Sequence, residues 1–224
     1  KSGKYDLGIV VDPDVDRLCF ISEDGAPFGE EYTLVAIADY ILAKEKGNTV
    51  SNLSSTRALA DVTNQHGGTY FAAAVGEVNV VTKMKAEHAI IGGEGNGGVI
   101  FPESHYGRDA LVGIGLFLTH LASKNKKVSA LRAEYPAYIM SKNKIELSAD
   151  LNVDLILATV AEQFKDERVN TIDGVKIDFA NRWVHLRKSN TEPIIRIYSE
   201  APTEEEANGL AQQIMQVIEA IASK

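Results

Sequence analysis

Near its start the sequence places three aspartates at alternate positions of a short segment between two apolar runs. Asp12, Asp14 and Asp16 alternate in DPDVDR, and Arg17 follows directly. Carboxylate oxygens are the ligands that hard divalent cations prefer, and alternate positions of an extended chain point to one side. Three close carboxylates also repel one another unless a cation neutralises them. The spacing therefore predicts a Mg²⁺ site at these aspartates, and a solvated acidic turn is the alternative.

The segment 187–196, RKSNTEPIIR, carries groups that suit a bound phosphate. It has an arginine at each end and short polar side chains between them, which gives five candidates: Arg187, Ser189, Asn190, Thr191 and Arg196. Planar guanidinium groups beside the N–H groups of a turn bind a tetrahedral dianion better than a single lysine does. Apolar residues precede and follow the segment, so we expect a loop between two strands. The alternative is a hydrogen-bonded polar turn with two surface arginines.

A glycine-rich segment, 92–98 (GGEGNGG), follows an apolar run at 89–92. Ligand loops in open α/β sheets lie at the carboxyl ends of strands, and glycines let a ligand approach the backbone closely. Glu94 offers an acceptor and Asn96 an amide, which together suit paired sugar hydroxyls. The alternative is a flexible connector. Three further polar residues are candidates for contact with a substrate: Glu77, His105 and Arg108. Each lies at or before the start of an expected helix, where an exposed polar side chain is equally expected without a ligand.

Hydrophobic periodicity indicates the elements that must position these segments. In the first part of the chain we expect strands at 6–11, 18–22, 49–53, 69–74 and 89–92, and helices at 30–44, 56–66, 77–85 and 110–122. The strand at 6–11 reads as fully buried, and the alternation predicts a three-layer α/β domain with a mostly parallel sheet. Further on, we expect strands at 139–147, 175–179, 182–188 and 194–200, with helices at 149–164 and 204–221. This second pattern predicts a small α+β domain.

Composition narrows the classes of partner. The chain has 224 residues, of which 45% are hydrophobic, so it can bury a sizeable core, and its formal net charge is −8. An acidic chain argues against non-specific binding to nucleic acid or to anionic membranes. No apolar run approaches the roughly 20 residues that a bilayer span needs. The single cysteine, Cys19, fits a reducing compartment, so we expect a cytoplasmic protein.

Three segments resemble the motifs of one family. As R-x-S-N-T-E-P-x-x-R, the segment 187–196 resembles the phosphate-binding loop of the α-D-phosphohexomutases, the family of phosphoglucomutase, phosphomannomutase and phosphoglucosamine mutase. DPDVDR is similar to the family's metal loop, commonly D-G-D-G-D-R, with Pro13 and Val15 in place of glycines. GGEGNGG resembles the sugar loop, typically G-E-x-S-G-H, with Asn96 in place of serine and Gly98 in place of histidine. The segments also follow the family's order along the chain.

The resemblance implies a mutase that interconverts hexose 1-phosphate and hexose 6-phosphate through a phosphoserine enzyme and a 1,6-bisphosphate intermediate. It assigns Mg²⁺ to the three aspartates, a catalytic role to Arg17, the sugar to Glu94 and Asn96, and the phosphate to the five candidates in 187–196. It also implies four parts of the chain: the end of the family's second domain (1–22), the third, α/β domain with the sugar loop (23–127), a linker (128–138) and the C-terminal phosphate-binding domain (139–224).

The family's phosphoserine lies in a T-A-S-H-N-P-like loop of the first domain, and this sequence contains no such loop. The resemblance therefore predicts that N-terminal domains of the same protein are missing here and that the chain alone does not catalyse the reaction. Two other functions stay open. A haloacid-dehalogenase-like sugar phosphatase would use Asp12 and Asp14, although no convincing downstream acidic pair is present. A non-catalytic module would bind sugar phosphates without Mg²⁺.

Overall fold

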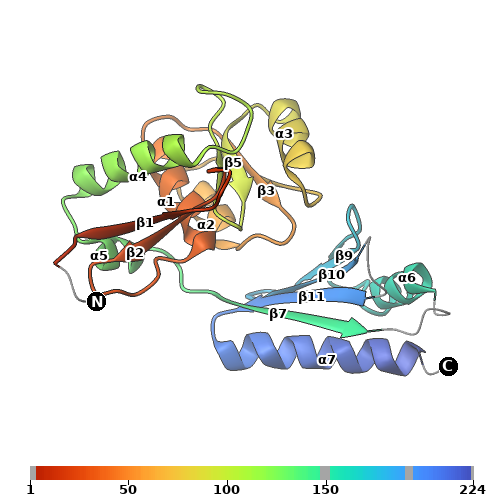
Figure 1. Ribbon diagram of the computed structural model, residues 1–224. Coiled ribbons are helices and arrows are strands. Elements are labelled where there is room, and N and C mark those ends of the chain that lie inside the picture. Colours follow the sequence, from red (N-terminus) through yellow and green to blue (C-terminus); the bar gives the residue numbers. More distant parts are fainter. Residues whose placement is uncertain (1–3, 147–151, 190–193, 223–224) are drawn as a thin grey trace. The chain divides into compact units, whose positions relative to one another are not determined.

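Strands and helices alternate through the first half of the chain, and the computed structural model assembles them into a sheet with helices on both faces (Figure 1). The structure describes residues 4–146, 152–189 and 194–222. It divides into two units, Lys1–Ala137 and Tyr138–Lys224, each considered by itself. Among the described residues, no helix is both long enough and apolar enough to cross a membrane.

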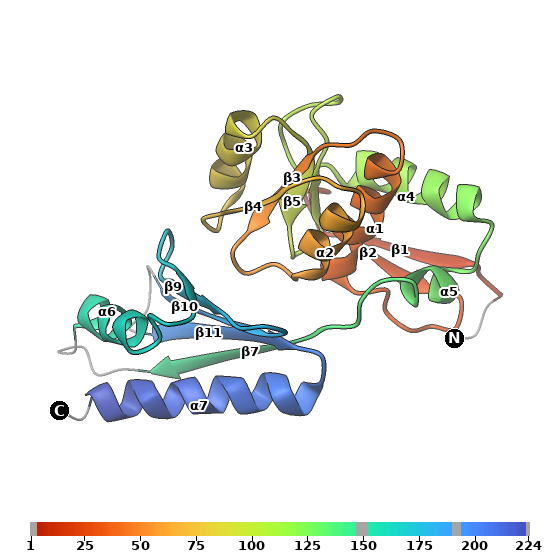
Figure 2. The ribbon, with the colours of Figure 1, turned by 180° about the vertical axis from the view of Figure 1, so that it is seen from behind.

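The main sheet of the first unit has four strands in the order β4 (Tyr70–Ala73), β3 (Asn48–Asn52), β5 (Ala89–Glu94) and β6 (Gly98–Ile100). β3 runs parallel to β4 and β5, whereas β6 is antiparallel to β5. α1 (Glu30–Leu42) and α2 (Ala58–Gln65) pack together on one face, and α3 (Glu77–Ala86) covers the other (Figure 2). α4 (Ala110–Lys124) packs against α1. The predicted three-layer α/β architecture is confirmed.

β1 (Leu7–Val11) and β2 (Leu18–Ser22) form a separate antiparallel pair that carries the aspartate segment between them. β2 is anchored in the unit, because the ring of Phe20 stacks on Phe117 of α4 with centroids 3.8 Å apart. The prediction of a fully buried first strand is wrong: Ile9 is 44% exposed and Val10 is 52% exposed. Among the described residues β1 pairs with β2 alone, and an apolar run does not reveal whether another element covers it.

The segment 128–138, predicted as a linker, contains a short helix, α5 (Val128–Arg132). Val128 and Leu131 are buried in the first unit, and the Ser129 N–H donates to Glu23 Oε2 at 3.1 Å. Most of this segment is therefore packed structure and not a free connector. The division of the chain into the family's domains stays a prediction.

The second unit is a five-stranded antiparallel sheet with two helices on one face. The strand order is β7 (Ile139–Glu146), β11 (Ile194–Ala201), β10 (Trp183–Lys188), β9 (Val175–Asp178) and β8 (Arg168–Asn170). α6 (Val153–Gln163) and α7 (Glu204–Ala222) contact each other and the sheet, and they enclose the core with the inward-facing side chains of the strands. The predicted α+β architecture is confirmed, although β8 was not predicted.

Candidate functional site

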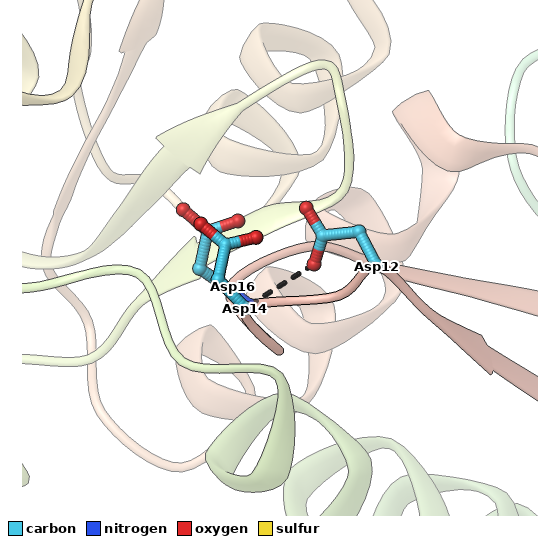
Figure 3. A group of neighbouring side chains, drawn as sticks. All are labelled: Asp12, Asp14 and Asp16. Atoms are coloured by element: carbon cyan, nitrogen blue, oxygen red, sulfur yellow. Dashed lines mark hydrogen bonds between the residues drawn. The ribbon is translucent and has the colours of Figure 1, made fainter.

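The three aspartates converge in the turn between β1 and β2. One carboxylate oxygen from each of Asp12, Asp14 and Asp16 lies within 4.8 Å of the others. Figure 3 shows the three carboxylates gathered beside the turn. The backbone reverses here, because Val15 has a φ of 57° and its N–H donates to the Asp12 carbonyl at 3.1 Å. We expected extended alternation to align the carboxylates, but a tight turn does so instead.

The surroundings of these carboxylates fit a hard divalent cation. Partial desolvation acts to raise the pKa of Asp12, but the N–H groups of Arg17 and Asp16, which donate at 3.0 and 3.1 Å, lower it below its usual value. Burial and the neighbouring aspartates raise the pKa of Asp16 despite the nearby Arg108. Asp16 Oδ1 is buried and accepts no hydrogen bond from any described residue. An oxygen-only donor set with one unsatisfied buried oxygen is suited to Mg²⁺.

The glycine-rich segment, predicted as a loop after a strand at 89–92, forms a tight hairpin. β5 extends to Glu94, which pairs with Gly98 at the start of β6. The hairpin lies against the aspartate turn, because the Leu18 N–H donates to the Gly97 carbonyl at 3.0 Å. Gly97 has a φ of 87°, and a Cβ there would lie 2.3 Å from the Leu18 carbonyl oxygen. Only glycine allows this approach, so the sequence itself brings the two segments together.

Glu94 and Asn96 occupy different environments in this hairpin. Glu94 is 3% exposed, and its Oε1 accepts from Asn52 Nδ2 at 2.8 Å and from the Gly76 N–H at 3.1 Å. Asn96 is half-buried at the tip, where its Oδ1 accepts from the Gly98 N–H at 3.2 Å. Asn96 is thus more accessible to a ligand than Glu94.

Arg108 joins the two segments. Its Nη1 donates to Glu94 Oε2 at 2.8 Å, and its Nη2 donates to Asp16 Oδ2. From the sequence, Arg108 was only one of the polar residues in a helix-entry loop. The signal that could have identified it is Gly98, which has no side chain to fill the space that Arg108 occupies. His105 instead binds Asp109, with Nε2 and Oδ2 2.9 Å apart, and its side chain is 50% exposed.

In the second unit the two arginines of the phosphate segment lie on strands and not in a loop. Arg187 of β10 is the register partner of Arg196 of β11, so the side chains share one face of the sheet. Arg187 Nε lies 3.2 Å from Asp173 Oδ2. The Ser189 N–H donates to the Ile194 carbonyl at 3.0 Å, which closes the hairpin. The other two candidates, Asn190 and Thr191, lie outside the described residues.

A third cation extends this pair. Lys144 of β7 is the register partner of Arg196, which places Arg187, Arg196 and Lys144 in one row across three strands. Lys144 Nζ lies 3.2 Å from Glu146 Oε1. A pocket of about 300 Å³ opens beside the row and is lined by Lys142, Asn143, Lys144, Ile194, Arg196 and Tyr198. Like charges directly opposite one another are unfavourable without an anion, so the row favours phosphate binding. The sequence could not indicate Lys144, because its partnership depends on strand register.

Two family models match most of this chain. Residues 29–138 match the family model described as phosphoglucomutase/phosphomannomutase, alpha/beta/alpha domain III, and residues 141–217 match that of the phosphoglucomutase/phosphomannomutase C-terminal domain. A Thermococcus kodakarensis protein named phosphoglucomutase/phosphomannomutase is 37% identical over 205 residues, which cover 90% of this chain and 44% of that protein.

Solved structures share the fold. A phosphoglucomutase/phosphomannomutase family protein from Burkholderia thailandensis superposes with a TM-score of 0.83 at 24% identity, over 98% of this chain and 48% of that one. The Aspergillus fumigatus N-acetylphosphoglucosamine mutase in complex with GlcNAc-6P and magnesium gives a TM-score of 0.69 at 14% identity, over 97% of this chain and 53% of that one. The chain thus spans about half the length of the relatives that it matches.

Proposed function

Because the chain belongs to the phosphoglucomutase/phosphomannomutase family, we propose that it supplies the magnesium, sugar and phosphate segments of an α-D-phosphohexomutase. The whole protein would interconvert hexose 1-phosphate and hexose 6-phosphate through a phosphoserine and a 1,6-bisphosphate intermediate. The serine would come from N-terminal domains of the same protein. We also propose a cytoplasmic location, which the single cysteine, Cys19, supports.

The observation that carries this proposal is the contact between the aspartate turn and the Glu94 hairpin. Leu18 bonds to Gly97, 79 positions further along the sequence, and Arg108 bridges Glu94 to Asp16, which lies 92 positions before Arg108. A cation site and a sugar site in one enzyme must be adjacent, because the metal acts on a phosphoryl group that is attached to the sugar.

Each residue type has a defined part in the proposed reaction. Asp12, Asp14 and Asp16 would hold Mg²⁺, which when bound neutralises charge on the transferring phosphoryl group. Arg17 has a half-exposed side chain, and its guanidinium would contact oxygens of that group. Asn96 would bind sugar hydroxyls from the tip of the hairpin. Glu94 would do so through Oε2, because a carboxylate oxygen has a second lone pair beside its bond to Arg108.

On the second unit, the cationic row would bind the phosphate that is not transferred. Arg187 and Arg196 provide the charge, and Ser189, Asn190 and Thr191 complete the proposed phosphate segment. Among the residues that the structure describes, none forms an ion pair with Arg196. Energy from this remote contact would position the sugar for reaction elsewhere on the ligand.

The other two functions receive no specific support. The relatives compared above are named as mutases, which favours neither a haloacid-dehalogenase-like phosphatase nor a non-catalytic module. The convergent aspartates also argue against a module that binds no metal. The substrate would be a hexose phosphate, and a preference for one hexose would be set by contacts at the Asn96 tip.

Phosphate binding can be tested with the chain as it stands. Trp183 is the only tryptophan, is buried in the second unit, and so reports the unfolding of that unit. Phosphate that binds the native state should raise the free energy of unfolding in urea, by about 2.7 kcal/mol at 100 times Kd, relative to chloride at equal ionic strength. Arg196→Ala should abolish most of this increase.

Lys165→Ala is the matched control, because it removes one positive charge from an exposed pair with Glu162 on the other face of the unit. It should keep the phosphate effect. Equal losses in Arg196→Ala and Lys165→Ala would mean that net charge alone is responsible and would contradict the assignment.

Catalysis needs a separate assay. The chain, incubated with glucose 1-phosphate, glucose 1,6-bisphosphate and Mg²⁺, should produce no glucose 6-phosphate, because the proposed serine lies on other domains. Turnover at ordinary enzymatic rates, together with phosphoserine on this polypeptide, would overturn that part of the proposal.

A further inference from the structure

Arg108 contacts carboxylates from three separate segments of the first unit. Its guanidinium binds Asp16 Oδ2 in the aspartate turn and Glu94 Oε2 in the hairpin, the latter at 2.8 Å. Its Nε lies 3.5 Å from Glu77 Oε2 at the start of α3, and its backbone N–H donates to Glu77 Oε1 at 2.9 Å. The Arg108 side chain is only 14% exposed. An arginine tied at this many points holds its partners in fixed positions.

The space for this side chain depends on Gly98. A Cβ built at Gly98 would lie 2.4 Å from Arg108 Cδ and 3.1 Å from Arg108 Cγ. Carbon atoms do not approach so closely, so a side chain at position 98 and Arg108 in its present place exclude each other. The glycine therefore lets Arg108 enter the site from the loop before α4.

Arg108 also distinguishes the two oxygens of Asp16. Oδ2 accepts from Arg108, whereas Oδ1 is buried and accepts no hydrogen bond from the residues described. Arg17 Nε lies 3.7 Å from Oδ1, which is beyond hydrogen-bonding distance. Because Oδ2 is occupied, Oδ1 is the oxygen that Asp16 presents to a cation.

We propose that Arg108 is a positioning residue that fixes Asp16 for metal binding through Oδ1 and connects the metal site to Glu94. Outer partners that orient the ligands of a metal typically change its affinity by about 10- to 100-fold when they are lost. The inference rests on the proposed function, since it takes Asp16 as a ligand. Because the same guanidinium also binds Glu94, Arg108 connects the proposed metal ligand Asp16 directly to the residue proposed to bind the sugar.

A simple charge argument predicts the opposite result, which makes the inference testable. Removing a cation that is bound to a carboxylate should strengthen the binding of a divalent cation if only electrostatics matter. Removing a positioning residue should weaken it. The sign of the change in affinity therefore separates the two explanations.

The experiment measures Mn²⁺ affinity and the Mn²⁺ electron paramagnetic resonance spectrum for the chain and four variants. Arg108→Gln removes the positive charge, and Arg108→Lys keeps the charge but lacks the planar guanidinium that binds two carboxylates at once. Gly98→Ala keeps the arginine but displaces its side chain. Lys83→Gln is the control, because it removes a positive charge from a partly exposed α3 pair with Glu87. Circular dichroism monitors folding. If Arg108→Gln fails to fold, Gly98→Ala and Arg108→Lys decide the outcome.

We expect Arg108→Gln and Gly98→Ala each to weaken Mn²⁺ binding by about tenfold or more and to broaden the spectrum. Arg108→Lys should be intermediate and Lys83→Gln unchanged. Tighter binding in Arg108→Gln, or wild-type affinity in Gly98→Ala, would overturn the positioning role while leaving the metal site intact. A wild-type chain that binds no Mn²⁺ would refute both this inference and the proposed metal site.

Discussion

His185 should make the second unit sensitive to mild acid. Its ring is 2% exposed, and its Nε2 lies 2.6 Å from the Asp173 carbonyl oxygen. Burial lowers its pKa from 6.5 to about 4, and the nearby charges of Lys176 and Arg187 act in the same direction, although the contact with Asp173 opposes them. The folded unit therefore binds a proton on this ring more weakly than the unfolded chain does.

The sign and size of the effect follow from that difference. Above pH 6.5 the ring is neutral in both states, so its contribution to stability is fully present. As the pH falls from 6.5 to 4, protonation of the unfolded chain removes stability, by about 2 kcal/mol at pH 5 and about 3 kcal/mol below pH 4. Replacing the histidine with glutamine, whose amide can donate to the same carbonyl, should remove this dependence on pH.

Trp183 fluorescence in urea, measured between pH 7.5 and pH 5, tests the prediction. The wild-type unit should lose about 2 kcal/mol more than His185→Gln over this range. His105→Gln is the control, since that half-exposed histidine lies in the first unit and the tryptophan in the second. Because carboxylates titrate in every variant, the test compares the slope of the free energy of unfolding against pH between wild type and His185→Gln. Parallel slopes for wild type and His185→Gln would refute the reasoning.

Four further substitutions test the geometry of the two units. Gly97→Ala should destabilise the first unit by at least about 2 kcal/mol in thermal unfolding, because Gly97 has a φ of 87° and the new Cβ would meet the Leu18 carbonyl. Gly115 of α4 has open space around it, so Gly115→Ala should stabilise the same unit by roughly 0.5–1 kcal/mol. Asp109→Ala removes the side-chain cap of α4 and should cost about 1 kcal/mol in the same assay. Lys144→Ala should weaken phosphate binding several-fold in a fluorescence titration without altering Mn²⁺ affinity; unchanged phosphate affinity would remove Lys144 from the row.

Periodicity predicted the long elements well, because they repeat one physical pattern over many residues. The helices at 30–44 and 204–221 were found as α1 and α7 to within two residues at each end. Three short elements, β6, β8 and α5, were not predicted, because their three to five residues show too few repeats of any period. Their existence depends on pairing or packing with distant residues, which one sequence does not display.

The candidate site divides in the same way. The residue types and the convergence of the three aspartates could be predicted from the sequence, because they depend on neighbours a few positions apart. The strand register that aligns Arg187, Arg196 and Lys144 could not, since it joins three separate strands. The close packing of Arg108 against Gly98 could not be predicted either, because this contact depends on the fold. The sequence thus predicts which residue types lie close together along the chain, but not which distant residues meet in the folded structure.

The distribution of charge within each unit explains how a chain with a net charge of −8 could bind an anion, as we propose. In water with physiological salt, charges act over about 8 Å, so a phosphate responds to the nearest side chains and not to the total. In the first unit the guanidinium of Arg108 is bound to the carboxylates of Asp16 and Glu94. In the second unit Arg196 has no such partner among the residues described, and cations flank it on both neighbouring strands. The proposed anion site therefore depends on the cations that lie close to Arg196 and not on the net charge of the chain.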